Sequence, residues 1–417
     1  MISRRPARIR EILGIIRDMK ILLSILLGIA ILPLGLPPIH AQTLAAANPT
    51  AVTASASEPF SGQSLCLPGV YLADPGNCLP LGPSLYLTEM AKNGLELPLR
   101  PLPATTPAPS LNAMTEMYLS VRSEGATPVY GSLEAAEART PGRYIAGGRG
   151  LKYLAVYQRV ENERGIFFQM VTGEWINAAD GDVACCTSMG RFQGLLFRQN
   201  PRNDFGWVLS PTKVKSSPGY NSPDTGQELN RETVVQIYAT QKDTATTWML
   251  IGPDQWVDGQ YVGRVMVNTT PPQGVTNNRW IEVNLGEQTL SVYQDGKLIF
   301  ATLIATGVKP FYTRPGLFQI QKKKVLETMS GAFEADKSDY YYLEDVPWTM
   351  YFDEARALHG AYWRTMYGYM ASHGCVNLSP GDSHWLFGWA QEGDWVYVWD
   401  PTGQTPTDPK YYGAGGA

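Results

Sequence analysis

Charged residues are scarce in this sequence, and positive charge is not in excess. Of the 417 residues, 17% are Asp, Glu, Lys or Arg, and the formal net charge is −4. This balance provides no basic field, so we do not expect nucleic acid as a partner. The 11 Trp and 22 Tyr residues instead favour mainly β domains with aromatic surfaces, and the length suggests two to four domains.

The apolar run near the amino terminus is short for a membrane-spanning helix. It covers Ile21 to Leu36, whereas a span needs about 20 residues. A basic segment precedes it, and no charged residue stands between Lys20 and Glu58. We therefore expect residues 1–41 to be a cleaved signal peptide, with a retained membrane anchor as the alternative. Both interpretations place the rest of the chain outside the cytoplasm, in the cell wall or periplasm or secreted.

Cysteine is also rare, with five residues in the chain. Cys66 and Cys78 lie in a Pro- and Gly-rich stretch, and in an oxidising compartment we expect a disulfide between them. Zinc is less favoured there, because no second Cys or His pair lies nearby. The neighbours Cys185 and Cys186 would form a strained bridge and are expected to be buried thiols without a function. Cys375 is then the odd cysteine, and it needs another explanation.

Two stretches without hydrophobic periodicity divide the chain. Residues 42–112 begin with small uncharged residues and end in a proline-rich run, so we expect a tether that contains the disulfide-bonded loop segment. Residues 401–417 are expected to be a disordered tail.

A weak internal repeat lies between these stretches. Tyr157 to Trp175 and Tyr238 to Trp256 have the same spacing and are offset by 81 positions. Each copy alternates β-forming residues and ends in a turn before an aromatic strand. The pattern resembles bacterial SH3-like domains, which implies two small β-barrels at residues 113–210 and 211–275. Cell-wall binding and a role as a rigid spacer are both open for them.

The alternation becomes regular from Trp280 onward. Residues 280–285 and 289–293 alternate as strands do, Asp295-Gly296 is a strong hairpin signal, and a third strand follows. We therefore predict a sheet-based domain over residues 279–400.

Three of the four histidines lie in one short window of this domain, together with Cys375. They are His359, His373 and His384, while His40 belongs to the export segment. A thiol nucleophile needs a base, a group that orients the base, and N–H donors for the oxyanion. His359 can fold back onto Cys375, whereas His384 stands beside Trp385 in a predicted helix and is expected to be structural.

The residues around Cys375 fit the remaining requirements. Gly360 follows the candidate base, and its carbonyl can fix the imidazole tautomer. Gly374 precedes the thiol, where successive N–H groups can converge on an anion. Ser379 and Pro380 predict a capped helix just after the nucleophile, and the helix dipole is expected to favour a thiolate.

These residues also resemble a known family. His359-Gly360 followed by the run Ser372 to Asn377 (SHGCVN) is similar to the signature of L,D-transpeptidases with a YkuD-type catalytic domain. The similarity extends over residues 279–400 and implies a β-sandwich with a short helix after the nucleophile. The family usually has 14 to 17 residues between the first His and the Ser, but this chain has 12, so we expect a differently shaped loop over the site.

The resemblance implies a role for each residue. Cys375 would attack the third residue of a donor stem tetrapeptide of peptidoglycan and release the terminal D-Ala, with His359 as base and the Gly360 carbonyl as its orienting group. The oxyanion site would be framed by His373, Gly374 and Cys375, with Ser372 among the residues that orient it. An amine of an acceptor stem would then form a 3→3 cross-link. No cofactor or metal is implied.

Other interpretations stay open at this point. Water in place of the amine would give an L,D-carboxypeptidase, and the same pair would serve another exported cysteine peptidase. Three further interpretations are less favoured: a non-catalytic wall-binding protein, a buried structural Cys375, and a zinc site built from His359, His373 and Cys375. As substrate-binding residues the sequence offers Asn377 and, among several aromatic residues, Tyr351 and Trp363.

Overall fold

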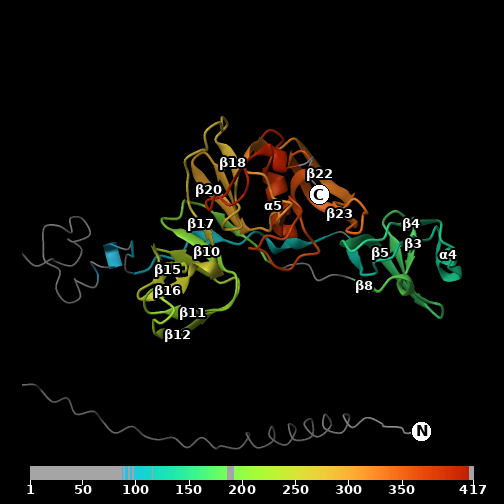
Figure 1. Ribbon diagram of the computed structural model, residues 1–417, viewed down its shortest axis with the longest axis horizontal. Coiled ribbons are helices and arrows are strands. Elements are labelled where there is room, and N and C mark those ends of the chain that lie inside the picture. Colours follow the sequence, from blue (N-terminus) through green and yellow to red (C-terminus); the bar gives the residue numbers. More distant parts are fainter. Residues whose placement is uncertain are drawn as a thin grey trace, which may run out of the picture. The chain divides into compact units, whose positions relative to one another are not determined.

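The computed structural model describes residues 98–114, 116–185 and 192–412, together with Leu87, residues 90–92, Gly94 and Leu95. Strands dominate this part of the chain, as Figure 1 shows. Its residues include no helix that is long and apolar enough to cross a membrane. The expected signal segment and the Cys66–Cys78 pair lie outside the described residues, as does Cys186.

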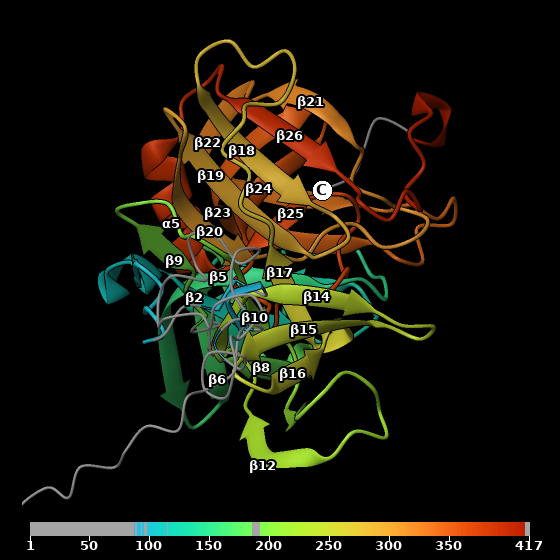
Figure 2. The same ribbon diagram turned by 90° about the vertical axis from the view of Figure 1, so that its left-hand side faces the viewer.

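The domain predicted at residues 279–400 is built as a sandwich of two sheets. Figure 2 shows most of the first sheet, in which β18 (Arg279–Asn284) pairs antiparallel with β19 (Thr289–Gln294) and parallel with β26 (Trp395–Trp399). The hairpin predicted at Asp295-Gly296 joins β19 to β20, with positive φ at both residues. The strands of this sheet, in spatial order, are β1 (Ala104–Thr105), β9 (Leu195–Phe197), β20 (Lys297–Leu303), β19 (Thr289–Gln294), β18 (Arg279–Asn284), β26 (Trp395–Trp399) and β21 (Gly316–Gln319).

The second sheet crosses the expected domain boundary. Strand β23 (Tyr341–Asp353) of the sandwich pairs in parallel with β5 (Lys152–Asn162), so the sheet continues into strands from residues 117–185. In spatial order they are β25 (Val376–Leu378), β24 (Arg356–Gly360), β23 (Tyr341–Asp353), β5 (Lys152–Asn162), β2 (Met117–Val121) and β8 (Val183–Cys185), with β22 (Lys322–Gly331) paired to β23.

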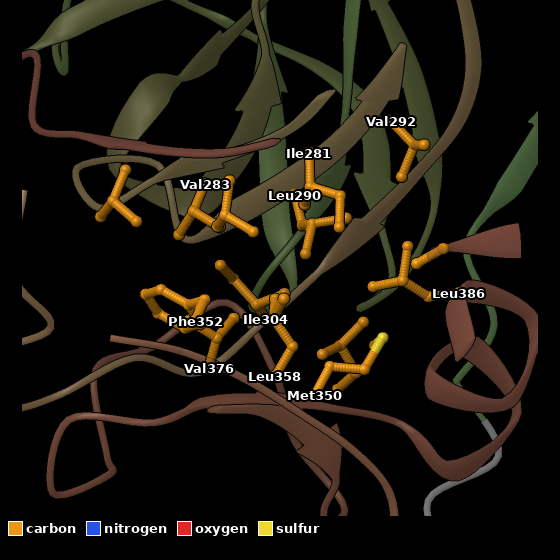
Figure 3. Packing of buried hydrophobic residues seen from close by; sticks show 14 of the residues in the cluster. Ile281, Val283, Leu290, Val292, Ile304, Met350, Phe352, Leu358, Val376 and Leu386 are labelled. Carbon is orange, nitrogen blue, oxygen red and sulfur yellow. The ribbon is translucent and has the colours of Figure 1, made fainter. Parts of the chain in front are cut away.

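The main core fills the space between the two sheets. Figure 3 shows Ile281, Leu290 and Val292 of the first sheet facing Met350 and Leu358 of the second, and each of them is fully buried. Burial of such a side chain contributes about 1.5–3 kcal/mol. Helix α5 (Pro380–Trp389) closes the sandwich through Leu386, and the side chain of Ser379 caps it, as the sequence predicted.

Residues 116–185, here called the first module, form a small β structure around β2. The strand β2 pairs with β5 and with β8. The other elements are β3 (Thr127–Val129), α4 (Leu133–Ala138), β4 (Arg143–Ile145), β6 (Gly165–Met170), β7 (Trp175–Asn177) and the 3-10 helix η2 (Ala178–Asp180).

Residues 204–265, here called the second module, repeat this arrangement around β10 (Asp204–Val208). β10 pairs with β13 (Val234–Ile237) and with β17 (Val262–Val265), as β2 pairs with β5 and β8. The 3-10 helix η3 (Gly259–Tyr261) stands 81 positions after η2, so the sequence repeat corresponds to a structural one. The remaining strands are β11 (Thr212–Lys215), β12 (Asp224–Leu229), β14 (Ala239–Lys242), β15 (Thr247–Gly252) and β16 (Gln255–Asp258).

Two expected boundaries need correction. The division between residues 210 and 211 is wrong, because β10 belongs to the second module by its pairing with β13 and β17. Residues 401–412 of the expected disordered tail form turns and the short helix η4 (Pro409–Tyr411). The side chain of Asp400 accepts hydrogen bonds from the backbone of this segment, which explains its order.

Candidate active site

Two neighbouring parallel strands bring His359 and Cys375 into one cavity. β24 and β25 pair with His359 opposite Asn377, and Cys375 immediately precedes β25. Both side chains are about 2% exposed. They line a cavity of about 370 Å³ whose other walls come from β23, the loop before Cys375 and the first module.

The imidazole of His359 is fixed by its backbone. Nδ1 lies 3.2 Å from the carbonyl oxygen of Gly360, as the sequence predicted for an orienting group. A carbonyl only accepts, so this contact places the proton on Nδ1 and leaves Nε2 as an acceptor. Burial, with a smaller contribution from the charge of Arg364, lowers the pKa of His359 to about 4 against the opposite effect of the Gly360 contact. His359 is therefore a neutral base at neutral pH.

The thiol of Cys375 is also neutral in the resting site. Its Sγ accepts a hydrogen bond from the N–H of Ala357 at 3.4 Å and donates to the carbonyl of Ala355 at 3.8 Å. Burial raises the pKa of Cys375 to about 11, although the Ala357 N–H and the charge of Arg356 act in the opposite direction. The expectation that the helix after the nucleophile favours a thiolate is wrong, because the desolvation of the sulfur is the larger effect.

The turn before the nucleophile is held by Ser372. Its Oγ donates to the carbonyl of Cys375 at 2.6 Å and accepts from the N–H of Gly374 at 3.2 Å. Gly374 has φ of +120°, a conformation that other residues rarely adopt, and its carbonyl accepts from the hydroxyl of Thr313. The ring of His373 stacks on Phe333 with 4.6 Å between centroids while also lining the cavity.

The expected substrate-binding residues separate into two groups. Trp363 and Asn377 line the cavity, and Oδ1 of Asn377 is buried without a hydrogen-bond partner among the described residues. Tyr351 does not line it, because it lies farther along β23, opposite Lys322 and Ala357. A role of Tyr351 in substrate binding therefore has no support from the cavity.

The structure gives less support to a catalytic role of His384 and to a metal site. The ring of His384 stacks on Trp348 at 3.9 Å, and its Nδ1 contacts the carbonyl of Leu111, in keeping with a structural role. Within the described part of the chain, no three His, Cys, Asp or Glu side chains are grouped so that they could hold a metal ion.

Comparisons with known proteins identify the domain that holds this cavity. The family model of the YkuD L,D-transpeptidase catalytic domain matches residues 278–398. The catalytic domain of an Enterococcus faecium L,D-transpeptidase is 30% identical over 30% of this chain and 100% of its own length, with a TM-score of 0.27. Residues 278–398 therefore form an L,D-transpeptidase catalytic domain. The family match covers the domain predicted from the sequence.

Two further structures are similar over part of their length. An L,D-transpeptidase from Stackebrandtia nassauensis is 30% identical, over 33% of this chain and 60% of that one, with a TM-score of 0.26. L,D-transpeptidase 1 from Mycobacterium tuberculosis is 21% identical, over 29% of this chain and 61% of that one, with a TM-score of 0.25. A comparison with curated proteins gives no match. The SH3-like nature of the two modules stays a prediction.

A loop of the L,D-transpeptidase domain joins both modules. This active-site loop, residues 361–371, runs between His359 and Ser372. On one side the ring of Tyr362 stacks on Tyr118 of the first module with 3.5 Å between centroids. On the other side the carbonyl of Tyr367 accepts from Arg231 of the second module at 2.8 Å.

Each attachment is part of a buried cluster. Tyr362 is fully buried, and its hydroxyl donates to the carbonyl of Glu344 at 2.7 Å. Tyr367 packs with Trp207 of the second module and with residues of the first sheet. A Cβ on Gly368 would lie 2.3 Å from the Leu209 side chain, so the loop approaches the second module closely. This loop, which is shorter than is usual in the family, is therefore held at two points, one on each module.

Several residues of the cavity were not predicted from the sequence. Most come from β22, β23 and the active-site loop, but three come from the first module, outside the L,D-transpeptidase domain. The run of three glycines around one arginine at residues 147–150 is the signal that could have marked this segment. The additional lining residues are Arg149, Gly150, Leu151, Met329, Asp339, Tyr341, Leu343, Arg364 and Ala371.

Proposed function

We propose that this protein is a cysteine L,D-transpeptidase that acts on peptidoglycan stem peptides outside the cytoplasm. The observation that carries the proposal is the pair in the cavity: a buried thiol and a buried imidazole on adjacent strands, with Nε2 available as the base. The amino-terminal sequence supports the location, since both of its interpretations lead out of the cytoplasm.

The neutral charge states suggest the order of proton transfers. As Sγ of Cys375 attacks the carbonyl of the third stem residue, its proton passes to Nε2 of His359. The N–H of Cys375, at the end of the turn that Ser372 holds, is the proposed donor to the oxyanion, since the N–H of Gly374 already donates to Ser372. The imidazolium then gives its proton to the leaving amino group, D-Ala departs, and a thioester remains on Cys375.

The second half of the reaction uses the same groups. The side-chain amine of an acceptor stem attacks the thioester, His359 removes its proton, and the thiolate is reprotonated as it leaves. The product is a 3→3 cross-link. Attack by water would release the stem as a tripeptide, so the ratio of the two products measures the balance between transpeptidase and carboxypeptidase activity.

The experiment uses wall muropeptides with tetrapeptide stems and the purified protein, with products identified by mass spectrometry. Wild type is expected to release D-Ala and to form cross-linked dimers. Cys375→Ala removes the nucleophile and should abolish both, and His359→Ala and Cys375→Ser should retain at most about a thousandth of the rate, since the pair acts as a unit.

The control variant is His384→Ala, which alters a histidine away from the cavity and should stay within a few-fold of wild type. D-Ala release by Cys375→Ala would refute the proposed nucleophile. Cross-link formation by Cys375→Ala would show that the cross-linking activity resides at another site of the protein.

A further inference from the structure

A glycine-rich segment of the first module lies against the wall of the catalytic cavity. This strap, residues 147–151, leads into β5. The backbone N–H of Arg149 donates to the carbonyl of Ser338 at 2.8 Å, and the carbonyl of Leu151 accepts from the N–H of Tyr342 at the same distance. The strap is therefore tied to the segment just before β23 by backbone hydrogen bonds on both sides of Arg149.

The glycines of the strap permit this close approach. A Cβ on Gly148 would lie 2.7 Å from backbone atoms of Tyr340, and one on Gly150 would lie 2.5 Å from the carbonyl oxygen of Asp339. Any side chain at either position would push the strap away from the cavity. Two glycines thus bring the single long side chain between them, that of Arg149, to the cavity.

Two guanidinium groups line the cavity, and they have different surroundings. Arg364 donates to the carbonyl of Ala371 at 2.8 Å, so it holds the active-site loop together. Arg149 is exposed, and one of its terminal N–H groups donates to the hydroxyl of Ser338 at 3.1 Å. Its other side-chain N–H groups have no acceptor among the residues that the structure describes. Arg149 can therefore still form charge-assisted hydrogen bonds.

The acidic groups nearby are already engaged by the backbone. Asp339 lines the cavity and accepts from the N–H groups of Phe333 and Glu334. Burial raises the pKa of Asp339, but these N–H groups lower it by more, and its carboxylate stays ionised. Asp336 accepts from the N–H of Ser338, and the Arg149 charge adds to the lowering of its pKa. Neither carboxylate forms an ion pair with the guanidinium within 4 Å.

We infer that Arg149 is a specificity-determining residue that binds a carboxylate of the donor stem peptide, which makes the first module part of the active site. The inference rests on the proposed function. A donor attacked by Cys375 carries a carboxylate on the terminal residue beyond the scissile bond, and its third residue can carry another on its side chain. A guanidinium binds a carboxylate through two parallel hydrogen bonds. Arg149 and Cys375 line the same cavity, which has the size of a short peptide segment.

The test compares donor peptides that differ in one carboxylate. Four tetrapeptides are used, with the terminal carboxyl and the side-chain carboxyl of the third residue each free or amidated. For wild type, the KM should be about tenfold lower for donors that keep the recognised carboxylate than for donors in which it is amidated. The position at which amidation raises KM identifies the recognised carboxylate. In Arg149→Gln the preference should be lost, with KM raised about tenfold for the acid and kcat within about twofold. Arg149→Lys keeps the charge and should retain part of the preference.

Two matched variants separate recognition from folding. Ser338→Ala removes the side-chain contact of the strap but keeps the guanidinium, and Arg159→Gln removes an exposed arginine of the same module that pairs with Glu161. Both should leave KM within about twofold, and thermal unfolding of Arg149→Gln should match that of wild type.

If Arg149→Gln keeps the wild-type ratio of KM values between acid and amide donors, the inference is overturned. The proposed function is then still intact, because wild type turns the donors over. An equal loss of turnover for all four donors would also overturn it, because a carboxylate contact cannot act on an amide. Failure of the proposed function would look different, since wild type would then release no terminal residue from any donor.

Discussion

The two modules share a framework of strands and yet contact the catalytic domain in different ways. In both, a first strand pairs with the central and last strands, and a 3-10 helix precedes the last strand. The first module joins its strand β5 to β23 and so extends a sheet of the catalytic sandwich. The corresponding strand β13 of the second module stays in a separate three-stranded sheet.

A repeated sequence can therefore supply two distinct supports to one site. The segment before β5 carries Arg149 to the catalytic cavity, whereas the corresponding segment before β13 carries Arg231 to the carbonyls of Leu209 and Tyr367. The first module therefore contributes to the wall of the site, and the second holds one end of the active-site loop. The comparison predicts that only changes in the first module alter substrate preference.

The largest effect is expected where the loop meets the first module. Tyr362→Ala removes a fully buried ring that stacks on Tyr118, and should lower the free energy of unfolding by about 3–5 kcal/mol. Denaturant titration measures this. Tyr362→Phe loses only the hydrogen bond to the Glu344 carbonyl and should cost about 1 kcal/mol. Tyr144→Ala, an exposed tyrosine of the same module, should cost below about 0.5 kcal/mol. A cost for Tyr362→Ala as small as that of Tyr144→Ala would show that the stack does not hold the loop.

A smaller effect is expected at the second module. Arg231→Gln leaves the carbonyls of Leu209 and Tyr367 without their charged donor, and should lower the free energy of unfolding by about 2 kcal/mol. Lys213→Gln is the control, because Lys213 is an exposed partner of Asp224 and should contribute below about 0.5 kcal/mol. The preference between acid and amide donors should not change in Arg231→Gln. A changed preference would contradict the division of roles between the modules.

The smallest effect is expected from pH, because the clamped loop and the cavity walls keep His359 buried. Burial lowers the pKa of His359 to about 4, so the neutral base is present above that pH and is lost only as the pH falls through 4. The rate constant for acylation should therefore keep about 90% of its plateau value at pH 5, where an ordinary histidine would leave about 3%. Burial also raises the pKa of Cys375 to about 11, so no rise is expected between pH 7 and 9. A half-maximal rate near pH 6.5 would mean that the loop admits water to the imidazole.

Local signals were sufficient to predict the catalytic core. The hairpin at Asp295-Gly296, the helix capped by Ser379 and the contact between His359 and the Gly360 carbonyl all follow from residue types at fixed short spacings. The family signature covers this same region, and the repeat with an offset of 81 indicated two similar modules. These features depend on neighbours in the sequence.

Features that depend on distant partners could not be predicted in this way. Alternation identifies a strand but not the strand beside it, so the pairing of β5 with β23 was missed, and β10 was assigned to the wrong module. The strap at residues 147–151 lines the cavity only because of that pairing. The charge states of Cys375 and His359 depend on burial by the whole domain, which no local pattern reveals.

The proposed function depends on acylation of Cys375, and mass spectrometry detects this modification. Intact-protein mass spectrometry after incubation with ertapenem should show one adduct on the wild-type protein, and peptide mapping should place it on the peptide that contains Cys375. Cys375→Ala should show no adduct under the same conditions. An adduct on Cys375→Ala, or a wild-type adduct mapped to another residue, would contradict the account.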